Sequence, residues 1–254
     1  MILPLEIIKY FVLAKGRHGI HSPFVYDFVD KCLKIDLPPL FINQRTAIFS
    51  KLKSSNTSIA ITDFGAGSKK LKSSRKVQSI FNISSSKGKY GDLLYKLSHF
   101  YKPGEILELG TSIGIGSIHL KTGFPEANVT TVEGCTETLS VAIENFNDLD
   151  LTFQTINETF HSFLSKLTSE KYDLIFIDGH HDGLALKDYL EKLKPHAHND
   201  TIFILDDIRW SSSMFEAWNE IIQSDNFHVT IDLFRLGIVI PKKQQTKQHF
   251  MIRY

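Results

Sequence analysis

From about residue 104 onward, short apolar runs rich in β-branched residues alternate with polar segments of helical length. Each run is a predicted strand, and the runs cover residues 105–109, 128–133, 151–156, 172–178 and 201–207. A further helix is predicted over 212–224, where one face carries the apolar residues Phe215, Trp218, Ile221 and Ile222. This alternation is typical of a parallel sheet whose strands are joined by right-handed helical crossovers.

Two more apolar runs, 227–234 and 235–241, follow each other almost without a gap. A crossover between parallel strands needs about a dozen residues or more, so these two runs are predicted to form an antiparallel hairpin. The predicted fold class is therefore α/β. We expect a Rossmann-like, doubly wound, mostly parallel seven-stranded sheet closed by an antiparallel hairpin, with a helical N-terminal cap.

The first hundred residues lack this alternation. Helical patterns occur at 22–33, which begins with the good cap pair Ser22-Pro23, and at 91–100. The basic stretch 69–81 is also predicted to be helical. We predict that residues 1–84 form a helical cap and substrate segment, and that residues 85–254 form the α/β domain.

Near the N-terminus, Ile7, Ile8, Phe11 and Val12 recur at helical spacing. This amphipathic helix is expected to pack on its own domain or on a second copy of the chain, so a homodimer is one arrangement considered. Glu6 interrupts the apolar stretch, and we identify neither a signal peptide nor a membrane span. The expected partner is therefore not a membrane, and the expected location is cytoplasmic.

The composition, 42% hydrophobic and 22% charged, allows a sizeable core. The formal net charge of +1 gives no basic footprint for nucleic acid, which we do not expect as a partner. Two cysteines, Cys32 and Cys135, are too few for a disulfide framework.

Two glycine-rich loops compete for the role of a cofactor loop. The first, "ITDFGAGSKKLKSS" at 61–74, is followed by neither a strand nor an acidic residue at the distance that a Rossmann-type unit requires. The second, at 105–117, is followed by a helical segment and a strand that ends on Glu133, where a carboxylate can accept both ribose hydroxyls. Gly110 permits the tight turn, and Gly114 and Gly116 let a ligand approach the backbone at the helix N-terminus. We interpret the first loop as a structural turn of the cap or, alternatively, as an acceptor-side wall.

Acidic residues follow the fourth and fifth predicted strands. Asp178, His180, His181 and Asp182 follow one strand, and Asp206 and Asp207 follow the other. Ligands of a doubly wound sheet bind beyond the carboxyl ends of its strands. Three close carboxylates require raised pKa values or a bound cation, and oxygen ligands suit Mg²⁺, Mn²⁺ or Ca²⁺.

The motifs "ILELGTSIGIGS", "VTTVEG", "YDLIFIDGHH" and "FILDDIRW" resemble those of class I S-adenosylmethionine-dependent methyltransferases, in the branch of catechol and caffeoyl-coenzyme A O-methyltransferases. The resemblance covers roughly residues 85–241. It implies S-adenosyl-L-methionine as cofactor, with Asn157 and Glu158 as weak candidates beside its adenine. The cofactor-binding residues implied are Glu108, Gly110, Thr111, Ser112, Gly114, Gly116, Glu133, Gly134 and Asp178.

The resemblance further implies that Asp178, Asp206 and Asp207 hold a divalent metal such as Mg²⁺, with Asp207 standing where the branch has asparagine. It places His181 where that branch often has a basic residue, so His181 and Asp178 are the candidate catalytic residues. Three interpretations stay open for this acidic region: metal-assisted transfer, metal-free acid–base or proximity transfer, and a structural network.

The predicted function is methyl transfer, most simply to an oxygen of a small-molecule acceptor. His18, His21 and Trp210 are candidate substrate contacts, and Lys69, Lys72 and Arg75 are candidates for an anionic substrate. The rival hypotheses are a nicotinamide-dependent oxidoreductase and a catalytically inactive methyltransferase-fold binding module. The G-x-x-x-G-x-G spacing disfavours the oxidoreductase.

Overall fold

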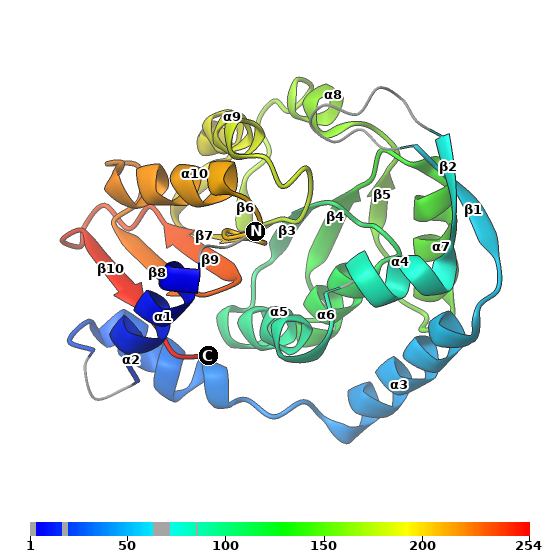
Figure 1. The fold of residues 1–254 in the computed structure, drawn as a ribbon, viewed down its shortest axis with the longest axis horizontal. Helices are drawn as coiled ribbons and strands as arrows, with labels where there is room; N and C mark the ends of the chain where they lie inside the picture. Colours follow the sequence, from blue (N-terminus) through cyan, green and yellow to red (C-terminus); the bar gives the residue numbers. More distant parts are fainter. Residues whose placement is uncertain (1–3, 17–19, 63–71, 85) are drawn as a thin grey trace. The chain divides into compact units, whose positions relative to one another are not determined.

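The alternation of strands and helices predicted after residue 104 is present in the structure, a computed structural model of the chain (Figure 1). The structure describes all residues except 1–3, 17–19, 63–71 and 85. By their internal contacts the residues form two units. Unit 1 contains residues 1–34 and 164–254, and unit 2 contains residues 35–163.

Unit 2 carries the first half of the α/β alternation. Its parallel strands β3 (Glu105–Leu109), β4 (Asn128–Val132) and β5 (Gln154–Ile156) lie in the order β3-β4-β5. Helices α6 (Ile115–Gly123) and α7 (Thr136–Asn147) connect them. The strands are short and β-branched, and the buried side chains of β3 and β4 fit a sheet that is covered on both faces.

The remaining elements of unit 2 precede or follow this alternation. Helix α5 packs along α6, and Phe41 of α3 stacks on Tyr95 of α5 with ring centroids 5.1 Å apart. The elements are α3 (Pro39–Ser54), β1 (Ser58–Thr62), β2 (Lys72–Lys76), α4 (Val77–Ser84), α5 (Gly88–Tyr101) and α8 (Phe160–Leu164), whose last residue belongs to unit 1.

Unit 1 carries the second half of the alternation and both ends of the chain. Its strands lie in the order β10-β8-β9-β7-β6. They are β6 (Tyr172–Ile177), β7 (Ala197–Leu205), β8 (Val229–Leu233), β9 (Leu236–Ile240) and β10 (Gln248–Met251). Strands β6 and β7 are parallel, and β9 pairs antiparallel with both β7 and β8, which confirms the predicted hairpin.

Helices and short 3₁₀ turns complete unit 1. Helices α9 and α10 lie side by side (Figure 1). The two ends of the chain meet where Lys15 and Ile252 form a parallel bridge. The helical elements are α1 (Pro4–Leu13), α2 (Pro23–Asp30), η2 (Cys32–Lys34), α9 (Gly183–Leu193), η3 (Lys194–His196) and α10 (Ser212–Gln223).

The fold is therefore α/β and Rossmann-like, with mostly parallel strands and antiparallel strands near the C-terminus, as predicted. The predicted count of seven strands misses β10, which pairs in parallel with β8. The division into a cap at 1–84 and a methyltransferase domain at 85–254 stays a prediction.

One local prediction in the N-terminal part is wrong, and two features of that part were not predicted. The stretch predicted as one basic helix begins instead with β2, which pairs antiparallel with β1, and the helix α4 starts only at Val77. Helix α3 was not predicted, because its apolar residues show little helical periodicity. In α1 the apolar face of Ile8, Phe11 and Val12 is exposed. Among the α1 side chains that the structure describes, Tyr10 is buried; its hydroxyl donates to the Ile252 carbonyl, and its ring lies 5.1 Å from that of Phe234.

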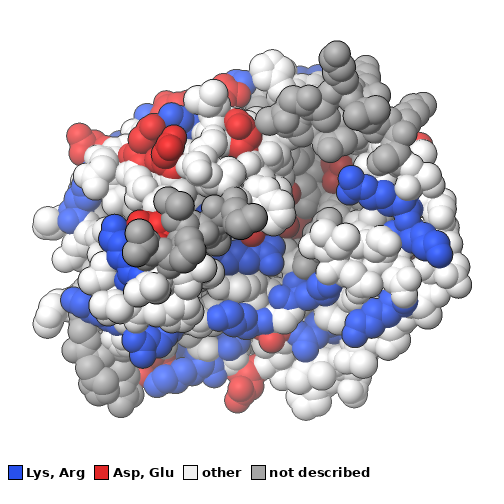
Figure 2. All heavy atoms as spheres, in the orientation of Figure 1, with Lys and Arg blue, Asp and Glu red and all other residues white. Residues whose placement is uncertain are grey.

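The surface carries both signs of charge. On the face drawn in Figure 2, Lys and Arg side chains and Asp and Glu side chains are interspersed with uncharged residues. Among the helices of the described ranges, none combines the length and the apolar character that crossing a bilayer requires.

Candidate active site

The loop between β3 and α6 turns sharply, through residues with left-handed backbone angles. Gly110 has φ 110°, Ser112 has φ 49° and Gly114 has φ 85°. Gly114 is the N-cap of α6 and has no side chain to cap it. A Cβ at Gly114 would lie 2.5 Å from Cε1 of Phe146, so both the backbone angle and the packing require glycine. The predicted cofactor loop thus has the conformation that leaves the helix N-terminus open to a ligand.

The carboxylate of Glu133 is fixed beside this loop. The backbone N–H of Ser112 donates to Oε2 at 2.9 Å, and that of Cys135 donates to Oε1 at 2.9 Å, on either side of Gly134. Nδ2 of Asn157 donates to the Glu133 carbonyl at 2.8 Å, which ties the segment after β5 to the same place. The structure therefore brings together the glycine loop, Glu133 and Asn157, and their assignment to the cofactor stays a prediction.

Glu108 lies beneath the loop and is fully buried. Its Oε2 accepts hydrogen bonds from the hydroxyls of Ser117 and Thr131, the latter at 2.6 Å, and Thr131 also bonds the Thr111 hydroxyl at 2.5 Å. Among the described residues, Oε1 has no hydrogen-bond partner. Burial, with a smaller contribution from the negative charge of Glu133, raises the pKa of Glu108 to about 7 despite the two hydroxyl donors.

Ser117, Thr131 and Thr111 form a polar network that the motif analysis did not single out as a unit. Ser117 donates to Glu108 from the first turns of α6, next to Gly116. The sequence contained a signal for this contact. Ser117 directly follows Gly116, the last glycine of the loop, and this position lies near the end of β3.

In unit 1, the ends of β6 and β7 bring three predicted carboxylates together. Asp178 follows β6, Asp206 and Asp207 follow β7, and the backbone N–H of Asp206 donates to the Ile177 carbonyl at 3.0 Å. Burial, the negative charge of Asp206 and a hydrogen bond with Asp206 raise the pKa of Asp178 well above its ordinary value. Burial and the Asp206 charge also raise the pKa of Asp207.

Arg235, in the turn between β8 and β9, is the residue of this cluster that the sequence analysis missed. Its Nε and Nη2 donate to the two carboxylate oxygens of Asp206 at 3.0 and 2.8 Å, and Nε lies 3.0 Å from Oδ1 of Asp207. Although burial favours the neutral guanidinium, the bond to Asp206 and the charges of the three aspartates raise the pKa of Arg235. No sequence signal linked Arg235 to residues about thirty positions earlier.

The predicted divalent metal does not fit this arrangement. Arg235 already binds both oxygens of Asp206 and one oxygen of Asp207, which are the atoms that a cation would need. Within the described ranges, no group of three or more His, Cys, Asp or Glu side chains is arranged to hold a metal ion. The assignment of Asp178, Asp206 and Asp207 as metal ligands stays a prediction, and the contacts of Arg235 speak against it, because its guanidinium occupies carboxylate oxygens that a metal would bind.

His181 and Trp210 lie next to the cluster. Nδ1 of His181 is 3.8 Å from Oδ2 of Asp207, and the rings of His181 and Trp210 have centroids 5.6 Å apart. The Trp210 side chain is exposed to 61%. His180, His181 and Asp207 have positive φ values of 62°, 36° and 52°, and such strained backbone in non-glycine residues concentrates at functional sites.

The neighbouring residues His180 and Asp182 have local structural partners. The ring of His180 bonds the Tyr189 hydroxyl. Asp182 is the N-cap of α9, where its Oδ1 accepts from the backbone N–H groups of Leu184 and Ala185 at 3.1 and 3.0 Å. Of the "DGHHD" stretch, Asp178 and His181 are therefore the residues that belong to the acidic cluster.

Of the other predicted substrate residues, the structure describes His21, Lys72 and Arg75. His18 and the "DFGAGS" turn with Lys69 lie outside the described residues. His21 is exposed just before the Ser22 cap of α2. Lys72 and Arg75 lie on β2 of unit 2. These substrate assignments stay predictions.

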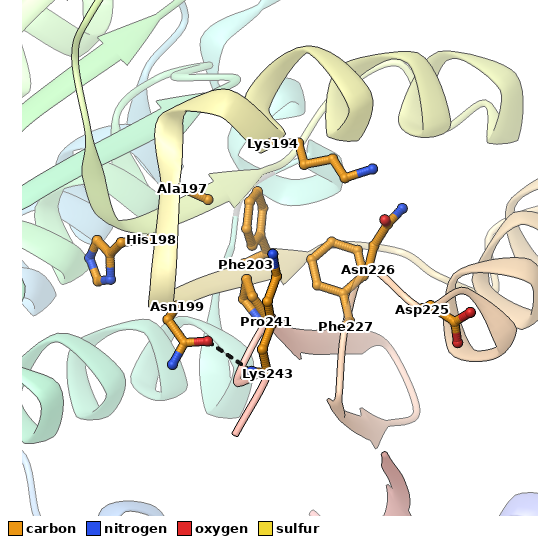
Figure 3. Close-up of a pocket in the computed structure, with 10 residues that line it drawn as sticks. All are labelled: Lys194, Ala197, His198, Asn199, Phe203, Asp225, Asn226, Phe227, Pro241 and Lys243. Carbon is orange, nitrogen blue, oxygen red and sulfur yellow. Dashed lines mark hydrogen bonds between the residues drawn. The ribbon is translucent and has the colours of Figure 1, made fainter. Parts of the chain in front are cut away.

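A separate cavity of about 280 Å³ lies in unit 1 at the opposite end of β7 from Asp206 (Figure 3). The rings of Phe203 and Phe227 pack edge to face in it, with centroids 5.5 Å apart. None of the residues predicted from the sequence as site residues lines this cavity. Its lining consists of Lys194, Ala197, His198, Asn199, Phe203, Asp225, Asn226, Phe227, Pro241 and Lys243.

Comparison with known proteins shows what the chain is similar to. Residues 107–208, from β3 to just after Asp207, match a protein family described as a methyltransferase domain. No curated protein sequence matches the chain.

Solved structures share the fold at low sequence identity. The SAH-bound methyltransferase PaMTH1 of Podospora anserina has 14% identity and a TM-score of 0.60, over 87% of this chain and 96% of the other. An O-methyltransferase of Bacillus cereus in complex with SAH has 15% identity and a TM-score of 0.54, over 82% and 93% of the two chains.

A third structure is that of the O-methyltransferase TomG of Streptomyces achromogenes, involved in tomaymycin synthesis and solved in complex with SAM. It has 17% identity and a TM-score of 0.51, over 56% of this chain and 72% of the other. Residues 107–208 therefore match a methyltransferase domain, and the chain shares its α/β fold with solved S-adenosylmethionine-dependent methyltransferases.

Proposed function

We propose that this methyltransferase transfers a methyl group from S-adenosylmethionine to a hydroxyl oxygen of a small-molecule acceptor. The observation that supports the acceptor chemistry is the pair His181–Asp207 beside the exposed ring of Trp210. Histidine is the side chain that most often takes a proton from a reacting group, and a neighbouring carboxylate can orient it. An exposed indole offers a flat apolar surface to a planar acceptor.

The residues of unit 2 fit the cofactor. Glu133, held by two backbone N–H groups, accepts the ribose hydroxyls. The open N-terminus of α6 and the backbone from Gly110 to Gly114 receive the methionine portion. The buried Oε1 of Glu108, without a partner among the described residues, is an acceptor below the same loop. When bound, S-adenosylmethionine supplies an electrophilic methyl group on a sulfonium.

On the acceptor side, the chain has to position one oxygen and take one proton. His181 accepts the proton of the acceptor hydroxyl, and Asp207 orients and stabilises the imidazolium that results. Asp178 is the second proton-handling candidate, because its carboxyl is paired with Asp206. Transfer by direct displacement needs little further covalent chemistry, so positioning carries most of the rate.

Cofactor binding is the first test. Titration calorimetry with purified protein is expected to give saturable binding of S-adenosylmethionine. Glu133→Ala is expected to weaken it at least about a hundredfold, because an ionised acceptor for two hydroxyls is lost. Glu144→Ala, on the exposed face of α7, is the matched control and should leave the affinity unchanged. Absence of binding by the wild type would refute the proposed function.

Turnover tests the acceptor chemistry. In a panel of small-molecule hydroxyl and amine acceptors, His181→Asn is expected to lower kcat at least about a hundredfold for a hydroxyl acceptor while leaving cofactor affinity intact. Tight binding of NADH in place of S-adenosylmethionine would favour the oxidoreductase alternative. Cofactor binding without turnover on any acceptor would favour the inactive binding module.

A homodimer is also proposed, since the exposed residues Ile8, Phe11 and Val12 of α1 supply an apolar surface that a second copy can cover. Light scattering coupled to size exclusion measures the mass directly. A monomer at all concentrations, or a dimer unchanged by Phe11→Lys, would contradict this assignment.

A further inference from the structure

We propose that Arg235 is the built-in cation of the acidic cluster and replaces the divalent metal that catechol-type O-methyltransferases bind at such a place. Asp178, Asp206 and Asp207 stand together at the ends of β6 and β7. Three neighbouring carboxylates need a counter-charge. In this chain a side chain, and not an ion from solution, provides it.

The geometry is that of a specific pair. Arg235 contacts Asp206 through two parallel N–H···O bonds of 3.0 and 2.8 Å, the bidentate arrangement that gives arginine–carboxylate pairs their strength. The same Nε lies 3.0 Å from Oδ1 of Asp207. The side chain of Asp206 is 1% exposed and that of Arg235 is 33% exposed, so solvent screens the bond to Asp206 only weakly.

The backbone holds Arg235 at this place. Its carbonyl accepts from the N–H of Ile208, the residue after Asp207, at 3.0 Å, and its own N–H donates to the Leu233 carbonyl at 3.0 Å. Phe234, just before it, has φ 73°, and its N–H donates to Oδ1 of Asp232 at 2.8 Å. The tight turn between β8 and β9 and the segment after β7 therefore fix the guanidinium from two sides.

The other arginine of the region cannot serve in its place. Arg209 lies only two residues after Asp207, yet its guanidinium binds both oxygens of the buried Asp232, at 2.8 and 2.6 Å, and the Phe234 carbonyl. Of these two arginines, Arg235 is thus the one that contacts the cluster, and Arg209 belongs to the core.

A guanidinium and a metal ion make different demands on an acceptor. A metal chelates two neighbouring oxygens, whereas a guanidinium occupied by Asp206 and Asp207 offers charge compensation without chelation. Resting on the proposed function, we infer that the acceptor class includes compounds with a single hydroxyl, and that a vicinal diol is not required.

Direct metal binding tests this inference without any turnover. Mn²⁺ binding to the full chain is followed by electron paramagnetic resonance of the free ion. The wild type is expected to show no saturable binding at the cluster. Arg235→Gln is expected to bind Mn²⁺ at least about tenfold more tightly than the wild type, because three carboxylates lose their counter-charge. The double variant Arg235→Gln/Asp206→Asn should lose this gain.

If Arg235→Gln folds poorly, Mn²⁺ binding by two further variants still tests the proposal. Arg235→Lys retains the charge and should behave like the wild type, whereas Asp206→Asn should not change the metal affinity of the wild type. Saturable, micromolar Mn²⁺ binding by the wild type that Asp206→Asn abolishes would overturn the proposal. So would a folded Arg235→Gln protein whose Mn²⁺ affinity equals that of the wild type.

Turnover supplies an independent readout. Activity of the wild type on a single-hydroxyl acceptor should survive exhaustive chelation, and loss of that activity on chelation would contradict a built-in cation. A failure of the wild type to bind S-adenosylmethionine, by contrast, would refute the proposed function and leave the Mn²⁺ result and its interpretation intact.

Discussion

The glycine loop of unit 2 and the acidic cluster of unit 1 both present carboxylates, but they hold them in different ways. Glu133 is fixed by the backbone N–H groups of Ser112 and Cys135. Asp206 and Asp207 are fixed by the side chain of Arg235. Backbone amides orient a carboxylate without cancelling its charge, which suits a residue that must bind a ligand. A guanidinium cancels charge as well, which suits a cluster that would otherwise repel itself.

The difference also decides what a sequence reveals. A carboxylate held by backbone groups depends on turn geometry, and glycines at fixed spacing report that geometry. A carboxylate held by a distant side chain depends on which strands become neighbours. Variants in the two regions are therefore expected to differ in the size of their effects.

The largest effect is expected for the arginine that lies near the cluster in sequence but not in contact with it. Arg209→Met should lower the free energy of unfolding by about 4 kcal/mol, because it leaves the buried Asp232 without its charged partner. Urea denaturation measures the loss. Arg253→Met, near the exposed chain end, is the control and should cost less than about 0.5 kcal/mol. A loss below about 1 kcal/mol for Arg209→Met would show that Arg209 is not a core residue.

The glycine loop is expected to respond next. Gly114→Ala should cost about 3 kcal/mol, since the left-handed backbone costs about 1–2 kcal/mol and the Cβ must displace the ring of Phe146. It should also weaken cofactor binding. Gly88→Ala is the matched control, because Gly88 has φ 58° but nothing within 4 Å of its Cβ position. Its cost should be only about 1 kcal/mol. Equal losses for the two variants would contradict the packing argument.

The pH dependence of stability tests the glycine-loop region through Glu108. Its pKa is about 7 in the folded chain against an ordinary value of 4.5, so between these values the folded state keeps a proton that the unfolded chain has lost. Stability must then fall as pH rises through this window. From about pH 5 to about pH 8, Glu108 should remove about 2.5 kcal/mol from the free energy of unfolding.

The comparison of wild type with Glu108→Gln isolates this contribution from those of other titrating groups. Denaturation curves of both proteins across the pH range are expected to converge at the acid end and to separate above neutral pH, with the variant the more stable. Parallel curves would mean that Glu108 titrates normally and is hydrated.

The smallest effect is expected at Asp182, which looked like part of the acidic site. Asp182→Ala should cost about 1 kcal/mol by removing the N-cap of α9, and Asp182→Ser should restore most of it. Neither variant should change the Mn²⁺ behaviour of the cluster. A tenfold or larger change in metal affinity would place Asp182 inside the acidic site after all.

Much of the fold followed from periodicity. The strands β3, β4, β6 and β7, the helices between them and the closing hairpin were predictable because each is a short run whose hydrophobic period differs from that of its neighbours. Helix α3 and the hairpin β1–β2 were not predictable. Their polar residues obscure the hydrophobic period, and contacts with partner elements stabilise them instead. Likewise Tyr10 of α1 is buried because its hydroxyl bonds the Ile252 carbonyl, a contact that the local pattern does not reveal.

Within the candidate site, the spacing of Gly110, Gly114 and Glu133 determined the loop and its carboxylate from the sequence alone. The interactions run between residues that consecutive strands of one sheet place at the same edge, so local pattern is enough. The sequence also placed Asp178, Asp206 and Asp207 at neighbouring strand ends.

Only the tertiary structure decided what compensates those aspartates. Arg235 enters the cluster because β9 pairs with β7, which brings the β8–β9 turn to the residues after Asp206. Arg209, much closer in sequence, is directed into the core toward Asp232. A linear motif specifies which charges a strand end carries, whereas the pairing of strands determines which opposite charge reaches them, and this is the physical reason that a metal was predicted where an arginine is found.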